Sequence, residues 1–422
     1  MPRTSKRMRL LRDLETNIED VVELAVIEGH NSLAWKTAED LLEAHEILSS
    51  LRYISPREQG AQHDNGMLDR LIYENPEGSF LALFRMQRQS FWVLVDQLKS
   101  HWETEDNRSG RGRASRPVYQ QLAVGLYVLG GEGGGVERHR VQLNIGHGTV
   151  ISYLWRCIYA LQHLIPTTIV WPDLAARQSW NQRLREDSKE IFHDCIGFLG
   201  GTGIILRDRP RVDYQEYFSP KSYYGFNLQA VCGWDRRFIY AYIQHPASVH
   251  DSTAFKNSSL YQNRDHQRRF EDHEFLLADK AYPLQRHVIT PYKGQAGREK
   301  DNITFNNHLS TPRVKIEHAF CILKARWPSL NNLPIRIGED RIKSHDRAVA
   351  WTMACLVLNN LLLDLHEDDS WLEWSTSTGD NTPGVEEPNV NHRELARAEA
   401  EQRAGECRRE DLKDRLIKSL PQ

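Results

Sequence analysis

The chain has 422 residues, of which 40% are hydrophobic and 26% are charged, and its formal net charge is -3. This length exceeds one compact core and predicts two folded domains with flexible ends. The longest apolar run, residues 351–365, contains Asn359, Asn360 and Asp364, so it predicts a buried helix rather than a membrane span. Six cysteines without a CxxC pair argue against a structural zinc site and a disulfide framework.

Charge is distributed unevenly along the chain. Residues 107–160 contain seven Arg and two Glu, whereas residues 367–387 contain seven acidic residues and no Lys or Arg. Such asymmetry can hide a basic, nucleic-acid-binding face inside a nearly neutral total. The first nine residues are basic and no apolar signal-peptide core follows them, so we expect an intracellular protein with a nuclear location.

The first half of the sequence predicts helices. Residues 1–75 form a charged helical extension, with a linker at residues 55–60. Residues 76–165 form a helical region with an amphipathic stripe from Phe84 to Leu98 and a helix over residues 119–129.

Two further helices, residues 136–145 and 148–164, are separated by a Gly-His-Gly turn. This pattern is typical of a helix-turn-helix and also of an ordinary helical subdomain. The basic side chains Arg138, Arg140 and Arg156 favour the first interpretation, because DNA phosphates are contacted by such groups.

From residue 190 the sequence predicts a mixed α/β domain that ends near residue 365. Strands are expected at residues 195–205, 224–232, 237–244 and 274–278, with helices at 252–261 and 313–327. Three strands, a helix, a fourth strand and a later long helix are the order of an RNase H-like domain. Residues 366–422 then predict a disordered acidic segment up to 391 and a charged helix, 393–416, that is exposed or binds a protein partner.

Three acidic residues occupy positions where a metal site could form. Asp251 follows the third strand, Asp279 closes the fourth strand, and Glu317 lies beside the apolar face of the long helix. Carboxylates in this order suit two Mg²⁺ ions that cleave a phosphodiester, whereas Asp251 alone is more typical of a helix N-cap. Arg313 and Lys324 share the helix face of Glu317 and could hold a phosphate.

Several linked motifs resemble those of PIF/Harbinger transposases and the nucleases derived from them. They are Pro-Ala-Ser-Val-His-Asp-Ser at 246–252, Leu-Leu-Ala-Asp-Lys-Ala-Tyr-Pro at 276–283, Thr-Pro-Tyr-Lys at 290–293, Arg-Val-Lys-Ile-Glu-His-Ala-Phe at 313–320 and Leu-Lys-Ala-Arg-Trp-Pro-Ser-Leu at 323–330. The resemblance implies an RNase H-like DDE catalytic domain with Mg²⁺ or Mn²⁺, preceded by an all-α DNA-binding region. Asp251, Asp279 and Glu317 fall on its acidic positions, as both metal ligands and catalytic residues.

The first strand departs from this pattern. The family carries Asp-Gly-Thr-His there, whereas residues 198–204 read Phe-Leu-Gly-Gly-Thr-Gly-Ile, which puts Gly200 in the place of the aspartate. Glycine offers no metal ligand. We therefore expect impaired cleavage, and we expect Gly200→Asp to restore a ligand without crowding.

Two functions remain open from the sequence. The first is a DDE-type endonuclease acting on DNA, with activity reduced by Gly200. The second is a domesticated copy that binds DNA or a protein partner without cutting. A phosphatase or glycosidase is disfavoured because no nucleophile motif or aromatic sugar-binding cluster is present. No membrane association is expected, and homo-oligomerisation is left open.

Overall fold

The computed structural model describes residues 6–28, 32–50, 66–103, 116–133, 135–186, 191–262, 269–367 and 392–420. The chain forms two compact units, Met1–Asp64 and Asn65–Gln422. The linker predicted at residues 55–60 lies outside the described residues. No helix in the described ranges is long and apolar enough to cross a membrane.

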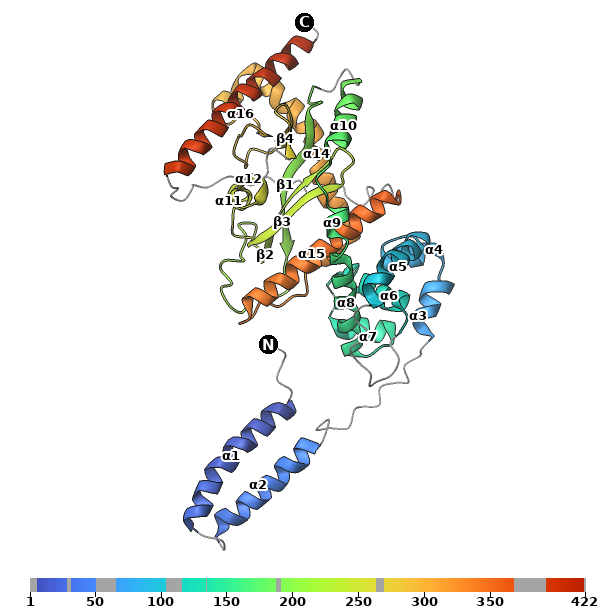
Figure 1. Cartoon of the computed structure of the whole chain (residues 1–422), viewed down its shortest axis with the longest axis vertical. Helices are drawn as coiled ribbons and strands as arrows, with labels where there is room; N and C mark the ends of the chain where they lie inside the picture. The colour runs from blue at the N-terminus through green and yellow to red at the C-terminus, as the bar shows by residue number, and fades with distance from the viewer. Residues whose placement is uncertain are drawn as a thin grey trace. The chain divides into compact units, whose positions relative to one another are not determined.

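The first unit is a pair of helices, α1 (Lys6–Glu28) and α2 (Leu33–Ser50), which pack against each other (Figure 1). The Arg7 guanidinium donates to the backbone carbonyls of Leu48 at 3.0 Å and Ser49 at 2.7 Å. These bonds join the start of α1 to the end of α2, so the two helices run antiparallel.

The helical part of the second unit surrounds a central helix, α6 (Val118–Leu129), which is buried along most of its length. Around it lie α3 (Met67–Asp69), the π-helical turn η1 (Arg70–Glu74), α4 (Glu77–Phe84), α5 (Arg88–Glu103), α7 (Val136–Leu143) and α8 (His147–Gln162). The predicted stripe from Phe84 to Leu98 is buried, but it belongs to two helices. Arg85 ends α4 because its backbone is left-handed, with φ of 62°.

A five-stranded mixed sheet forms the centre of the second unit, as the predicted α/β class requires. Its order is β3-β2-β1-β4-β5. The strands are β1 (Cys195–Ile205), β2 (Gly225–Cys232), β3 (Phe238–Pro246), β4 (Phe275–Ala278) and β5 (Val288–Ile289). β2 is antiparallel to both β1 and β3, whereas β1, β4 and β5 are parallel.

Helices cover both faces of this sheet. Two long helices, α14 (Lys300–Arg326) and α15 (Arg341–Asp364), share the larger hydrophobic core with β1 residues such as Phe198. The short helices α11 (Asp251–Lys256) and α12 (Ser259–Gln262) pack on the opposite face, where Leu199 belongs to a separate core. Side chains alternate between faces along a strand, so neighbouring β1 residues meet different helices.

The long helix predicted at residues 313–327 begins earlier, at Lys300, and contains Pro312 in its interior. The predicted apolar face is confirmed, because all four of its residues are buried: Ile316, Phe320, Leu323 and Trp327. Five further elements were not predicted from the sequence: α9 (Ile165–Thr168), α10 (Leu174–Glu186), β5, η3 (Ala296–Arg298) and η4 (Pro328–Asn331).

The C-terminal helix α16 (His392–Ser419) packs against α14 and β5 of its own chain. Leu412 and Leu416 are buried, and Arg408 donates to the carbonyl of Glu274 at 3.0 Å. The apolar side of this helix is therefore used within the chain, and a protein partner would meet its polar side. Most of the predicted disordered segment, residues 368–391, lies outside the described residues.

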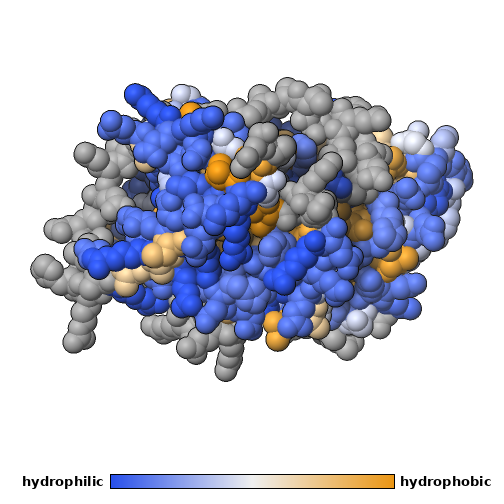
Figure 2. All heavy atoms as spheres, turned by 90° about the horizontal axis from the view of Figure 1, so that it is seen from above, coloured by the Kyte–Doolittle hydropathy of each residue, from blue (hydrophilic) through white to orange (hydrophobic). Residues whose placement is uncertain are grey.

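The coloured part of the face in Figure 2 is mostly hydrophilic, with hydrophobic side chains in small groups.

All six cysteines are free. This agrees with the prediction that they form no disulfide framework.

Candidate active site

The centre of β1 passes between two helices without contributing large side chains. Gly201 pairs with Gln229 on β2 and faces α11. A Cβ atom at Gly201 would lie 2.5 Å from Oδ1 of Asp251 and 2.6 Å from Nε2 of Gln229. Glycine at this position therefore leaves the space that the Asp251 carboxylate occupies above the strand.

Asp251 is held by two side-chain amides of β2. Its Oδ1 accepts hydrogen bonds from Nδ2 of Asn227 at 2.9 Å and from Nε2 of Gln229 at 2.7 Å. The Tyr282 hydroxyl donates to Oε1 of Gln229 at 2.5 Å. Gln229 and Tyr282 are almost fully buried. The helix α11 begins at Asp251 and its N-cap residue is His250, so Asp251 is not the N-cap of this helix.

The Tyr282 hydroxyl remains a hydrogen-bond donor over a wide pH range. Burial raises its pKa well above the ordinary value, and the negative charges of Asp251 and Asp279 raise it further. A protonated Tyr282 keeps the Gln229 amide oriented with its NH₂ group toward Asp251. The hydrogen bonds from Tyr282 to Gln229 and from Gln229 to Asp251 thus hold the Asp251 carboxylate in place on the α11 side of β1.

Asp279 lies at the end of β4, directly after Ala278, which pairs with Leu199 of β1. The parallel register places Asp279 next to Gly200. Its carboxylate accepts a hydrogen bond from the backbone N–H of Ala281. Lys293 donates to the carbonyl of Tyr282 at 3.2 Å, and burial lowers the Lys293 pKa although Asp279 opposes that shift.

Glu317 is on α14, the helix that covers the other face of β1. Its carboxylate is bound by the Arg313 guanidinium at 2.6 Å, and its side chain is 48% exposed. Ile316, the preceding residue, points at the strand instead. A Cβ atom at Gly200 would lie 3.0 Å from Cγ1 of Ile316 and 3.4 Å from the Phe320 ring. The fit of an aspartate at Gly200 therefore stays a prediction, and it requires Ile316 to move by a few tenths of an ångström.

The three acids do not fit a divalent ion as they stand. Within the described ranges, no group of three or more His, Cys, Asp and Glu side chains is placed to hold a metal. Asp251 is engaged by amides, Glu317 is engaged by Arg313, and the first strand supplies no carboxylate. Mg²⁺ requires oxygen ligands in a nearly octahedral arrangement, which this donor set does not provide.

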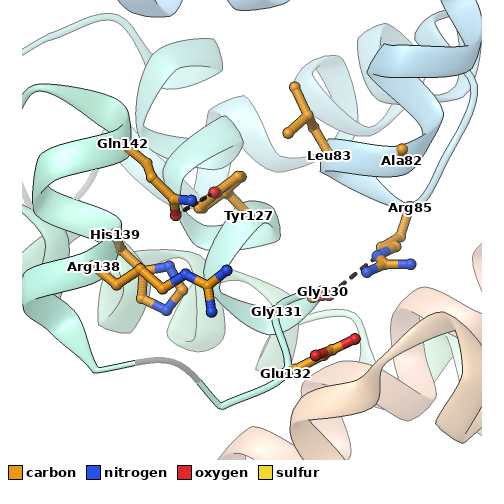
Figure 3. A pocket seen from close by; sticks show the side chains of 10 residues that line it. All are labelled: Ala82, Leu83, Arg85, Tyr127, Gly130, Gly131, Glu132, Arg138, His139 and Gln142. Carbon is orange, nitrogen blue, oxygen red and sulfur yellow. Dashed lines mark hydrogen bonds between the residues drawn. The ribbon is translucent and has the colours of Figure 1, made fainter.

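The predicted DNA-binding arginines differ in how they are held. Arg138 lines a cavity of about 240 Å³ and makes no ion pair with the other residues that the structure describes (Figure 3). Arg140 is paired with Glu137 at 2.6 Å. Arg156 donates to Gln121 at 3.0 Å from a partly buried position.

The turn between α7 and α8 falls at Asn144, with φ of 48°, and α8 begins at His147. The predicted turn lay slightly later, at residues 146–148. The inner side of α8 is packed against α6 and α15. Lys324 is on α14, one turn after Phe320.

Sequence reasoning overlooked the amides beneath Asp251. Asn227 and Gln229 are two residues apart in an otherwise apolar strand, so both face the same side of the sheet. That spacing of polar residues in a buried strand was the signal that could have identified them.

Residues 199–360 match the family model described as DDE superfamily endonuclease. The chain is also 22% identical, over 355 residues, to a protein named "Protein ALP1-like" from Arabidopsis thaliana. That similarity covers 80% of this chain and 81% of the relative. No solved structure was found to match the chain. The matched range contains Asp251, Asp279 and Glu317 and most of the sheet, so this region is similar to DDE superfamily endonucleases.

Proposed function

We propose that this chain is a DDE-type endonuclease of PIF/Harbinger origin that acts on DNA and whose metal-dependent cleavage is impaired. The sheet order β3-β2-β1-β4-β5, antiparallel and then parallel, supports an RNase H-like domain. The family match over residues 199–360 covers that sheet.

The surroundings of Gly200 carry this proposal. Gly200 lies next to Asp279, where an acidic first strand would complete the site, and Ile316 fills the adjoining space. An apolar side chain cannot bind a hard cation. Asp279 and Glu317 therefore lack the third carboxylate that would neutralise and orient the ion between them.

DNA is the proposed substrate class because basic side chains lie along α7 and beside Glu317 on α14. Arg138 projects from α7 into its cavity, and Arg313 and Lys324 are on α14 beside Glu317. The helical region 76–165 is proposed to contact the DNA backbone. A nuclear location follows from this substrate, and the basic first nine residues support it.

The residues of the site have distinct tasks in this proposal. Asp251, Gln229 and Tyr282 form a fixed polar surface, whereas Arg313 can exchange Glu317 for a phosphate oxygen, since both are anionic acceptors. This arrangement binds a phosphodiester more readily than it cleaves one.

The test uses the purified full chain with supercoiled plasmid and either Mg²⁺ or Mn²⁺. We expect DNA binding that weakens steeply with salt, and nicking near background that is unchanged in Asp279→Asn and Glu317→Gln. Strong nicking that both substitutions abolish would show a competent metal site and overturn the impairment.

The same measurements distinguish the endonuclease from the alternative function, a protein that binds DNA or a protein partner without cutting DNA. A chain that shows no salt-dependent affinity for DNA and no nicking would be a protein-interaction factor, and the DNA proposal would fail. The tight fit of Ile316 against Gly200 is the observation that favours a non-cutting protein.

A further inference from the structure

A cavity of about 240 Å³ lies in the helical part of the second unit, and none of its lining residues belongs to the candidate active site (Figure 3). Its wall comes from three places: the end of α4, the end of α6 with the glycine-rich segment after it, and one side of α7. Charged and polar side chains from separate helices therefore meet around one hollow, which is the arrangement of a small-ligand site.

The Arg85 side chain is fixed at one edge of this cavity. Its Nε donates to the backbone carbonyl of Gly130 at 3.1 Å. A Cβ atom at Gly130 would lie 2.5 Å from Cγ of Arg85, so the glycine leaves the space that the arginine stem occupies. Because the guanidinium is held before any ligand arrives, binding an anion there costs little side-chain entropy.

The backbone segment after α6 is also held in place. The carbonyl of Glu132 accepts a hydrogen bond from Nδ2 of Asn332 at 2.9 Å, and the carbonyl of Gly133 accepts one from Nη1 of Arg207 at 2.9 Å. Both donors lie far away in the sequence, after η4 and after β1. This wall of the cavity is therefore tied to the α/β part of the same unit.

Arg138 enters the cavity from the other side, on α7 (Figure 3). Its side chain is exposed and makes no ion pair with the other residues that the structure describes. Guanidinium groups are planar and donate paired hydrogen bonds to phosphate oxygens. Arg85 and Arg138 thus present two such groups to one cavity from opposite walls.

The charges in the wall are incompletely balanced. Among the lining residues, Glu132 is the one acid against two arginines. Burial lowers the pKa of Arg85, and the negative charge of Glu132 offsets only part of that shift. An anion in the cavity would supply further compensation, because a buried cation is stabilised by an opposite charge nearby.

The rest of the wall indicates the size and polarity of this anion. Oη of Tyr127 donates to Oε1 of Gln142 at 2.6 Å, so the NH₂ group of Gln142 is turned away from Tyr127 and is a further donor at the rim. The volume is below the range of about 300–1,000 Å³ that holds drug-sized ligands. The cavity therefore suits one compact anionic group rather than a whole nucleotide.

We propose that this cavity binds a phosphate group with about two negative charges, held between Arg85 and Arg138. The terminal phosphate of a DNA strand and a free phosphate ion both have this chemistry. An internal phosphodiester carries a single charge and continues in both directions, so it fits a hollow with facing walls less well. The strand end as the source rests on the proposed function, DNA binding, whereas the cavity itself does not.

The first experiment measures the affinity of the full chain, without divalent metal, for two short duplexes of one sequence. One duplex has 5′-terminal phosphates and the other has 5′-hydroxyl ends. We expect the phosphorylated duplex to bind about tenfold more tightly, and Arg138→Gln to reduce the difference to about twofold or less, because one of the two guanidinium groups is lost. Arg183→Gln, which removes the same charge from an exposed position on α10, is the matched control and should keep the difference.

The second experiment needs no DNA. Thermal unfolding of the full chain is measured in sodium phosphate and in sodium chloride of equal ionic strength. Phosphate should raise the unfolding midpoint of the natural chain by about 2 °C more than that of Arg138→Gln, since a ligand that binds the folded state stabilises it. The general stabilisation of proteins by phosphate is the same in both chains and cancels in this comparison.

The two experiments separate the cavity from the proposed function. Stabilisation by phosphate without a preference for the phosphorylated duplex assigns the cavity to a free phosphate ion, and the same stabilisation in a chain that does not bind DNA overturns only the proposed function. Salt-dependent DNA binding with neither effect overturns the cavity proposal and leaves the proposed function standing. Either effect that persists unchanged in both Arg138→Gln and Arg85→Gln also overturns the cavity proposal, because the phosphate then binds elsewhere.

Discussion

The two faces of β1 each carry a glycine, and the side chains that pack against the two glycines differ in polarity. On the α11 side, Gly201 leaves room for a carboxylate that is held by two amides and supported by Tyr282. On the α14 side, Gly200 leaves room that Ile316 fills. One face is a polar network with each member bound, and the other is an apolar contact.

The loss of an acidic residue therefore need not disturb the rest of a polar site. The hydrogen bonds around Asp251 do not involve a side chain at position 200. Asn227 and Gln229 of β2 donate to Asp251, and Tyr282 donates to Gln229. The fold can therefore persist while metal chemistry is lost. If the two faces are independent, substitutions on one face should leave the hydrogen bonds of the other face intact.

The largest stability difference is expected between Asp251→Ala and Glu317→Ala. Removing Asp251 takes away the charged acceptor of two buried side-chain amides, Asn227 and Gln229, although Gln229 still donates to Oδ1 of Asn227, and should destabilise the chain by about 2–3 kcal/mol. Removing Glu317 breaks an ion pair in which the Glu317 side chain is half-exposed and the Arg313 side chain is 19% exposed, and should cost about 1 kcal/mol or less. Urea unfolding midpoints measure both, and equal losses would show that Glu317 is part of the same structural network.

A smaller difference is expected between the two glycines. In Gly201→Ala the new methyl group displaces the Asp251 carboxylate, and we expect a loss of about 1–3 kcal/mol. Gly200→Ala should cost about 1 kcal/mol, because Ile316 must yield by only a few tenths of an ångström. Thermal unfolding of the two variants tests this order, and a reversed order would contradict the assignment of the faces.

Tyr282→Phe should cost about 1 kcal/mol at neutral pH, since one buried hydrogen bond is lost. The raised Tyr282 pKa means that the folded state keeps its proton at pH values where the unfolded state loses it. That stabilisation is complete below about pH 10, the ordinary tyrosine value, and declines above it. The difference in free energy of unfolding between the natural chain and Tyr282→Phe should therefore narrow between pH 9 and pH 11. A difference that stays constant over this range would show that the Tyr282 pKa is not raised.

The smallest effect concerns Arg138. Its side chain is not paired within the described residues, so Arg138→Ala should leave stability unchanged. If it contacts a phosphate, DNA affinity should fall uniformly across sequences and the slope of binding against salt should decrease by about one. Arg140→Ala, which removes a residue already paired with Glu137, is the matched control and should change the slope less.

The sequence predicted the main elements well where periodicity is strong. The apolar β1 run and the buried face of α14 were both identifiable, because a continuous apolar run and i, i+4 spacing reflect burial directly. The short strand β5 was missed, since two residues carry no period. The break at Arg85 was missed because a left-handed arginine has no sequence signature.

The candidate site was only partly predictable. Asp251, Asp279 and Glu317 were identified by order and motif, and that order does not specify what each carboxylate binds. The amide donors Asn227 and Gln229 come from a different strand, and only the folded sheet brings them under Asp251. The obstruction at Gly200 likewise arises from α14, more than a hundred residues later in the chain.

The proposal that the missing carboxylate at position 200 impairs cleavage is tested most directly by metal-dependent plasmid nicking. The variant is Gly200→Asp combined with Ile316→Ala, and the controls are the natural chain and Ile316→Ala alone. The second substitution removes Cγ1 and Cγ2 of Ile316, the two atoms that lie nearest to a Cβ at position 200. We expect nicking only in the combined variant, and we expect it to be lost when Glu317→Gln is added. Robust nicking by the natural chain that Glu317→Gln does not reduce, or a folded combined variant that binds DNA and does not nick it, would contradict the account.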